Sequence, residues 1–92
     1  MINLNEYFDG AVKSLAYENS GKSTIGVIDA GEFEFGTSTP ETMLIIEGEM
    51  KVLLSGNTEW TIYTAGQKFD VSANSSFKVR VEIPTSYLCK YK

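Results

Sequence analysis

The chain has 92 residues, of which 42% are hydrophobic and 22% are charged, and it contains no His and one Cys. Eight Lys and Arg against twelve Asp and Glu give a net charge of −4, and without a basic cluster nucleic acid is excluded as a partner. The longest apolar run, Met43–Ile46, is too short to span a membrane, and no charged segment followed by an apolar stretch marks an export signal. We expect one domain, residues 1–92, in the cytoplasm.

The absence of His removes one large class of chemistry. Ser/His/Asp and Cys/His triads, imidazole proton shuttles and imidazole metal ligands are all excluded. A single Cys cannot close a disulfide within the chain, and we interpret Cys89 as a buried structural thiol. Any reaction must therefore use carboxylates, hydroxyls, cations and aromatic rings.

Short alternating segments predict β-strands along nearly the whole chain. The first segment, Asn3–Gly10, is expected to be irregular, with room for one helical turn. Strands are then expected, in chain order, over Val12–Tyr17, Thr24–Ile28, Glu32–Thr37, Met43–Glu47, Met50–Leu54, Glu59–Thr64, Lys68–Val71, Ser76–Ile83 and Thr85–Tyr91. Turn-forming residues separate them at regular intervals, which indicates an antiparallel sandwich or barrel.

Two spaced patterns resemble the two motifs of the cupin fold. They run from Gly31 through Phe35, Thr37 and Glu41 to Gly48, and from Gly66 through Ser72 and Asn74 to Phe77. The resemblance implies a single-domain, all-β, cupin-like antiparallel β-barrel or jelly roll. Phe35, Thr37 and Phe77 stand where a metal-binding cupin carries three His, and Glu41 is the one ligand type that remains. One carboxylate cannot hold a transition metal, so no metal site is predicted.

A closer resemblance covers almost the whole chain. It rests on Asn5-Glu-Tyr-Phe8, Val27 with Gly31-Glu-Phe-Glu-Phe35, Pro40-Glu41-x-Met43, Gly48-x-Met50-x-Val-Leu-Leu54 and Pro84-Thr-Ser-Tyr-Leu-Cys89-x-Tyr91. These strings are similar to the small bacterial pyrimidine/purine nucleoside phosphorylase family. The family implies a metal-free cupin without a cofactor, in which inorganic phosphate is the co-substrate. It cleaves purine and pyrimidine nucleosides to the free base and α-D-ribose 1-phosphate.

The chain departs from this family at two places. Lys90 stands where Arg is expected in relatives, and the polar turn Ser72-Ala-Asn74 replaces a turn of the Pro-Gly type. These departures bear on phosphate affinity and on the rigidity of the turn.

Phosphorolysis requires a site for a dianionic phosphate, which a cation with hydroxyl groups can provide. The candidate ligands are Lys90, Arg80, Thr85, Ser86, Thr37 and Thr39. Arg80 alternates with Phe77, so it points outward, to solvent or to a partner chain, if Phe77 points into the barrel.

Glu41 and Thr37 are the candidate catalytic residues. Glu41 follows Pro40 at the entry to an apolar strand, where a carboxylate could bind ribose hydroxyls and favour an oxocarbenium-like transition state. A surface Glu at the start of a strand is the alternative. Candidate substrate-binding residues are the aromatic Phe35, Phe77 and Tyr87, for stacking of the base, and Met43 on the face of Glu41; plain core packing explains the same residues.

Two classes of function fit these observations. The first is a nucleoside phosphorylase of broad specificity. The alternative is a non-catalytic cupin module that binds a nucleoside or a small sugar, because no general acid is evident in the sequence. A barrel of this length has a marginal core and cupins commonly pair, so we also expect a homodimer with the N-terminal strands in its interface.

Overall fold

The computed structural model describes residues 1–92 as ten β-strands and one short 3₁₀ helix. In chain order these are β1 (Asn3–Tyr7), η1 (Phe8–Gly10), β2 (Val12–Glu18), β3 (Lys22–Ile28), β4 (Gly31–Gly36), β5 (Glu41–Glu47), β6 (Glu49–Leu54), β7 (Thr61–Thr64), β8 (Lys68–Val71), β9 (Ser76–Val81) and β10 (Thr85–Tyr91). The prediction of an all-β fold is confirmed. No helix in the structure has the length and apolar character needed to cross a bilayer.

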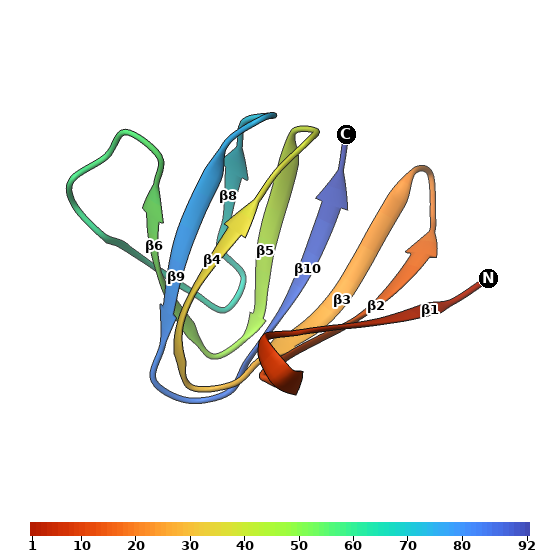
Figure 1. Cartoon of the computed structure of the whole chain (residues 1–92), viewed down its shortest axis with the longest axis horizontal. Coiled ribbons are helices and arrows are strands. Elements are labelled where there is room, and N and C mark those ends of the chain that lie inside the picture. The colour runs from red at the N-terminus through yellow and green to blue at the C-terminus, as the bar shows by residue number, and fades with distance from the viewer.

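The strands form two antiparallel sheets. The larger has six strands in the order β1-β2-β3-β10-β5-β8, and the smaller has four in the order β4-β9-β6-β7. Figure 1 shows β1, β2 and β3 fanning out on one side of the molecule, with β4, β9 and β6 on the other. No strand pairing joins the sheets, so the architecture is a two-sheet jelly roll and not a closed barrel.

Strict alternation along the strands builds the core between the sheets. In β9, Phe77, Val79 and Val81 are buried, whereas Lys78 and Arg80 are exposed. This confirms the predicted orientation of Phe77 and Arg80. Burying each such apolar side chain contributes about 1.5–3 kcal/mol, which is why the alternating pattern determines the strand positions so firmly.

The prediction of an irregular segment over Asn3–Gly10 is wrong for its first part. Residues Asn3–Tyr7 form β1, which pairs with β2 from Asn3↔Ala16 to Tyr7↔Val12. All five residues of β1 are exposed or only half-buried, so its side chains leave no alternating pattern in the sequence. Backbone hydrogen bonds to β2 define this edge strand, and η1 follows it as the single helical turn.

Candidate functional site

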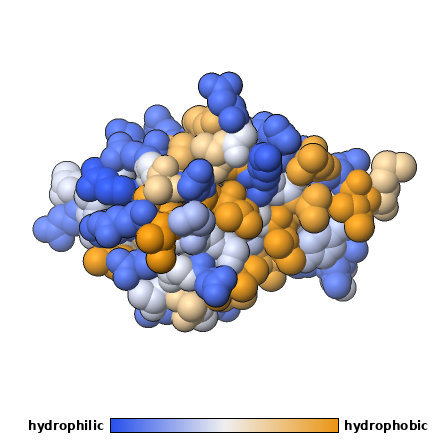
Figure 2. Space-filling model, turned by 90° about the horizontal axis from the view of Figure 1, so that it is seen from below, coloured by the Kyte–Doolittle hydropathy of each residue, from blue (hydrophilic) through white to orange (hydrophobic).

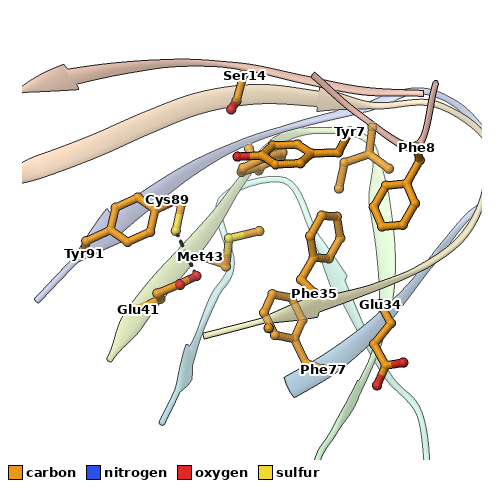
Figure 3. A pocket seen from close by; sticks show the side chains of 13 residues that line it. Tyr7, Phe8, Ser14, Glu34, Phe35, Glu41, Met43, Phe77, Cys89 and Tyr91 are labelled. Atoms are coloured by element: carbon orange, nitrogen blue, oxygen red, sulfur yellow. Dashed lines mark hydrogen bonds between the residues drawn. The ribbon is translucent and has the colours of Figure 1, made fainter. Parts of the chain in front are cut away.

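A cavity of about 260 Å³ opens between the two sheets. It is lined by residues from both sheets and from η1, namely Tyr7, Phe8, Ser14, Ile28, Glu34, Phe35, Gly36, Glu41, Met43, Phe77, Tyr87, Cys89 and Tyr91. Figure 3 shows aromatic rings at one end of this pocket and a carboxylate with a thiol at the other. Five sequence-predicted site residues therefore meet here: Phe35, Glu41, Met43, Phe77 and Tyr87.

The aromatic end of the pocket consists of Phe8, Phe35 and Phe77. The rings of Phe35 and Phe77 are stacked with centroids 5.6 Å apart, because these residues are direct partners across β4 and β9. Phe8 meets Phe35 edge to face at 5.7 Å. In Figure 3 the Glu34 carboxylate points away from these rings. The result is an apolar wall of ring faces and edges, a surface on which a planar base can pack.

The polar end of the pocket consists of Glu41, Cys89 and Tyr91, which β5 and β10 bring together. Tyr91 pairs directly with Glu41, and Cys89 pairs with Met43. The Cys89 thiol donates a hydrogen bond to Glu41 Oε1 at 3.4 Å, drawn as the dashed line in Figure 3. The Tyr91 hydroxyl lies 3.4 Å from Thr24 Oγ1 on the neighbouring strand β3. Glu41 is thus held at the cavity wall by a neutral donor.

Burial determines which of these groups can carry charge. Partial burial raises the pKa of Glu41 above its ordinary value, although the Cys89 hydrogen bond and the positive charge of Lys22 oppose the shift. Burial, reinforced by the Glu41 charge, raises the pKa of Cys89 to about 12. Burial also raises the pKa of Tyr87 to about 12 and raises that of Tyr91. The thiol and both phenols are therefore neutral donors at neutral pH.

A glycine in the middle of β3 makes room for Tyr87. Gly26 lies between Ser14 on β2 and Tyr87 on β10, its direct partners in the sheet. A Cβ at Gly26 would come within 2.5 Å of both the Cζ and the hydroxyl of Tyr87. The phenol ring therefore lies flat over the Gly26 backbone, and its hydroxyl extends toward Ser14, which also lines the pocket.

The predicted phosphate ligands do not converge on the pocket. None of Lys90, Arg80, Thr85, Ser86, Thr37 and Thr39 lines it. Arg80 points outward, bonds Glu32 through both Nε and Nη2, and stacks its guanidinium 4.4 Å from the centre of the Trp60 ring. Lys90 Nζ donates to the Asn19 carbonyl and to Ser23 Oγ. Both cations thus have partners on outer surfaces.

The hydroxyls among these candidates are bound elsewhere or point away. Thr37 Oγ1 donates to the Ser72 carbonyl at 2.6 Å and accepts from the Ser75 amide at 3.0 Å, which ties β4 to the β8–β9 turn. Thr85 is fully buried under Gly48, where a Cβ would approach its Oγ1 to 2.4 Å. Thr39 is exposed in the β4–β5 loop, and Ser86 is half-buried on β10 in the alternate set from Tyr87.

Sequence reasoning missed several residues that line the pocket. Tyr7 and Phe8 belong to the segment expected to be irregular. Tyr91 is part of the C-terminal string that carries the family resemblance, but it is not among the predicted site residues. The signal for Tyr91 was present, because Tyr87, Cys89 and Tyr91 alternate on one face of β10. The structure brings no three His, Cys, Asp or Glu side chains close enough to hold a metal ion.

Comparison with known sequences identifies relatives along the full chain. A family model described as pyrimidine/purine nucleoside phosphorylase matches residues 2–91. The pyrimidine/purine nucleoside phosphorylase of Marinobacter nauticus is 51% identical over 92 residues, covering 99% of both chains. That of Pseudoalteromonas atlantica is 53% identical over 92 residues, with 99% of both chains covered.

Solved structures agree with this relationship. A Vibrio parahaemolyticus protein of unknown function superposes with a TM-score of 0.96 at 42% identity, covering 100% of this chain and 99% of that one. An RmlC-like cupin from Shewanella frigidimarina superposes with a TM-score of 0.77 at 18% identity, covering 98% of this chain and 82% of that one. The match to the RmlC-like cupin shows the fold alone, and it confirms the prediction of a cupin-like fold. On the full-length sequence matches, the chain belongs to the pyrimidine/purine nucleoside phosphorylase family.

Proposed function

We propose that this chain is a pentosyltransferase that cleaves purine and pyrimidine nucleosides with inorganic phosphate. The C1′–N bond breaks while a phosphate oxygen bonds to C1′, and the bonding electron pair leaves with the base. The base nitrogen takes up the proton of hydrogen phosphate, so the products are the free base and α-D-ribose 1-phosphate. The pocket with an aromatic end and a polar end carries this proposal.

Each end of the pocket suits one part of a nucleoside. The stacked rings of Phe35 and Phe77 would take the base, and stacking accepts every base because all have a π-face. Met43 and Tyr87 would form the wall between the ends. The ribose would then lie toward Glu41, whose carboxylate binds its hydroxyls and stabilises positive charge that develops at C1′.

The proposed reaction uses neither a metal ion nor an organic cofactor. Binding, orientation and electrostatic stabilisation would supply the rate enhancement, with phosphate as the nucleophile. The reaction would take place within a single cupin-like domain in the cytoplasm. Thr37 would act by holding the β8–β9 turn beside Phe77, since its hydroxyl is engaged there.

The test is a cleavage assay on chelator-treated protein. Uridine and adenosine are each incubated with and without inorganic phosphate, and nucleoside and base are separated by chromatography. We expect base release from both substrates only when phosphate is present. Release without phosphate would indicate a hydrolase, and no release from either nucleoside would overturn the proposed reaction.

One observation favours the alternative of a non-catalytic module. Cys89, Tyr87 and Tyr91 are all held neutral by burial, so the polar end offers Glu41 as its single group for proton transfer near neutral pH. Titration calorimetry separates the two functions. Binding of uridine without any product formed in the presence of phosphate would establish the binding module instead.

The outer face of the six-stranded sheet supports the proposed homodimer. The strand registers align five aliphatic residues in one row across five strands, namely Leu4, Leu15, Ile25, Leu88 and Leu44. Leu4, Leu15 and Ile25 are exposed at 61%, 46% and 43%. Figure 2, the view from below, shows hydrophobic residues scattered among hydrophilic ones on that side of the molecule. Contiguous exposed apolar residues such as those of the row mark interaction surfaces.

Light scattering coupled to size exclusion tests this assembly. The wild type should have the mass of two chains, and Leu15→Glu should have the mass of one, because a charge within the row is desolvated on pairing. Ile62→Glu is the matched control, since Ile62 is 52% exposed but lies in the other sheet. A wild type with the mass of one chain would refute the homodimer.

A further inference from the structure

The polar end of the pocket lacks an obvious cation for phosphate, and the eight Lys and Arg of the chain allow a systematic search. Four of them are engaged on outer surfaces: Lys51 with Glu82, Arg80 with Glu32, Lys92 with Asp70, and Lys90 with Asn19 and Ser23. Lys13, Lys68 and Lys78 are exposed residues in the alternate positions of β2, β8 and β9, whose other residues are buried. Lys22 is the one that remains.

Lys22 alternates with residues that face the core. In β3, Thr24, Gly26 and Ile28 are buried and face the core, and Lys22 is in register with them at the open end of the strand, where it is exposed. Ser23 is buried as well but lies in the alternate set. Its ammonium lies 4.8 Å from the centre of the Tyr91 ring, on a residue that lines the pocket. Lys22 is not itself a lining residue of the cavity, but this cation–π contact places its charge directly beside one, at the edge of the polar end.

The strand registers give Lys22 and Glu41 a defined spacing. Tyr91 is the direct partner of Glu41, and it lies one residue beyond the Lys90↔Ser23 pair, next to Lys22. Lys22, Tyr91 and Glu41 therefore form one row across β3, β10 and β5. Two strand spacings separate Lys22 from Glu41, about 10 Å between their backbones. A phosphate beside Lys22 and a ribose beside Glu41 both fit across that width.

Resting on the proposed phosphorolysis, we propose that Lys22 is the cation that binds inorganic phosphate, at the Tyr91 edge of the polar end. The ammonium provides a charge-assisted hydrogen bond to the dianion. It also offsets repulsion between phosphate and the Glu41 carboxylate, which the structure couples electrostatically to Lys22. The charged groups facing Lys22 from the adjoining strands are Glu18, its direct partner on β2, and Glu41. No ion pair within 4.0 Å joins Lys22 to either, so the ammonium is available to a ligand.

The experiment compares Lys22→Met with Lys22→Arg and with the matched control Lys78→Met. Lys78 is an exposed lysine on β9 that does not line the pocket. The dissociation constant of inorganic phosphate is measured by titration calorimetry without nucleoside, and KM values for phosphate and for uridine are measured in the cleavage assay. We expect Lys22→Met to weaken phosphate binding and to raise KM for phosphate at least tenfold. KM for uridine should change less than threefold, Lys22→Arg should restore most of the affinity, and Lys78→Met should match the wild type.

The two readouts separate failure of this inference from failure of the proposed function. If wild type cleaves nucleosides and Lys22→Met retains the wild-type affinity for phosphate, Lys22 is not the ligand while the phosphorylase stands. If wild type binds phosphate through Lys22 but cleaves nothing, the anion site stands and the reaction is refuted. A wild type that binds no phosphate overturns the site directly. Circular dichroism of each variant verifies that the comparison is between folded proteins.

Discussion

At the scale of single residues, Glu41 lies where burial disfavours its charge but where its carboxylate lines the pocket. The carboxyl is half-buried at the cavity wall, where burial raises its pKa above the ordinary 4.5. The folded state therefore binds the proton more tightly than the unfolded chain does. The stabilising contribution of protonated Glu41 is complete below the unfolded pKa and is lost as the pH rises through the folded pKa. At neutral pH the ionised carboxylate thus weakens the fold that positions it.

Glu41→Gln should separate stability from activity. At pH 7 the melting temperature of the variant should exceed that of wild type, because a neutral amide occupies the site without the cost of desolvating a charge. The difference should shrink toward pH 4, where Glu41 itself is neutral. Phosphorolysis should fall by about 10²-fold, since charge stabilisation at C1′ is lost. Scanning calorimetry and the cleavage assay measure the two effects.

The control for this variant is Glu34→Gln, at the far edge of the same pocket. Glu34 is exposed, and the substitution should change stability by no more than about 0.5 kcal/mol. If Glu41→Gln is less stable than wild type at pH 7, the ionised Glu41 carboxylate does not destabilise the fold and the prediction is wrong.

At the scale of strands, the pocket depends on how closely β10 approaches the middle of β3. Gly26 leaves no side chain beneath Tyr87, so the phenol ring lies against the backbone of β3 and forms one wall of the cavity. Without this glycine the ring would have to rise into the pocket. The size of the cavity is therefore controlled by a residue outside its lining.

Gly26→Ala should be destabilising, because the new methyl would come within 2.5 Å of the Tyr87 ring. Overpacking of this kind costs about 1–3 kcal/mol, and urea denaturation measures it. The loss should be smaller when Tyr87→Leu is present, since the obstructing ring is then absent. Gly36→Ala is the matched control in β4, where a Cβ would approach only the Ser75 carbonyl, at 4.0 Å. Equal losses in the presence and absence of the Tyr87 ring would show that the contact is not the cause.

At the scale of the whole molecule, stability should depend on alkaline pH. Burial raises the pKa of Cys89 from 9.0 to about 12 and that of Tyr87 from 10.0 to about 12, and it raises that of Tyr91 as well. The unfolded chain releases these protons at the ordinary values while the folded chain retains them. The free energy of unfolding should therefore be highest below pH 9 and should fall as the pH rises toward about 12.

Urea denaturation at pH 8, 9, 10 and 11 checks this dependence. The first fall, between about pH 9 and 10, should come mainly from the thiol, because its ordinary pKa of 9.0 is the lowest of the three. Cys89→Ser should flatten the curve in that interval and leave the steeper fall above it, where the phenols titrate. A wild-type free energy that stays constant from pH 8 to 11 would contradict the buried, neutral state of these groups.

The sequence predicts strands best where one face is buried. Alternation located the strand expected over Ser76–Ile83 because Phe77, Val79 and Val81 all enter the core, although the observed strand ends at Val81 and Ile83 is exposed. The same reasoning missed Asn3–Tyr7, because backbone bonds to β2 hold that strand and no side-chain pattern records them. Ends of strands also differed; the strand expected over Glu59–Thr64 begins at Thr61.

The part of the site that lies within single strands and hairpins was predicted, and the part that depends on pairing of distant strands was not. Phe35, Phe77 and Glu41 came from spaced motifs within single strands and hairpins, which local sequence does encode. The position of Lys22 beside Tyr91 depends instead on β10 inserting between β3 and β5, a pairing of segments far apart in the chain. Gly26 carried an unused signal, since a glycine inside an apolar strand marks a close approach of neighbouring groups.

The position of β10 also has a consequence for how the protein is made. β10 is synthesised after every other strand, yet it lies between β3 and β5 in the six-stranded sheet and supplies Tyr87, Cys89 and Tyr91 to the pocket. Until the ribosome has released this segment, β3 and β5 each present an unpaired, largely apolar edge. We therefore expect the nascent chain to remain open and prone to aggregation until β10 is available. The sheet and the pocket are then completed in the same late step.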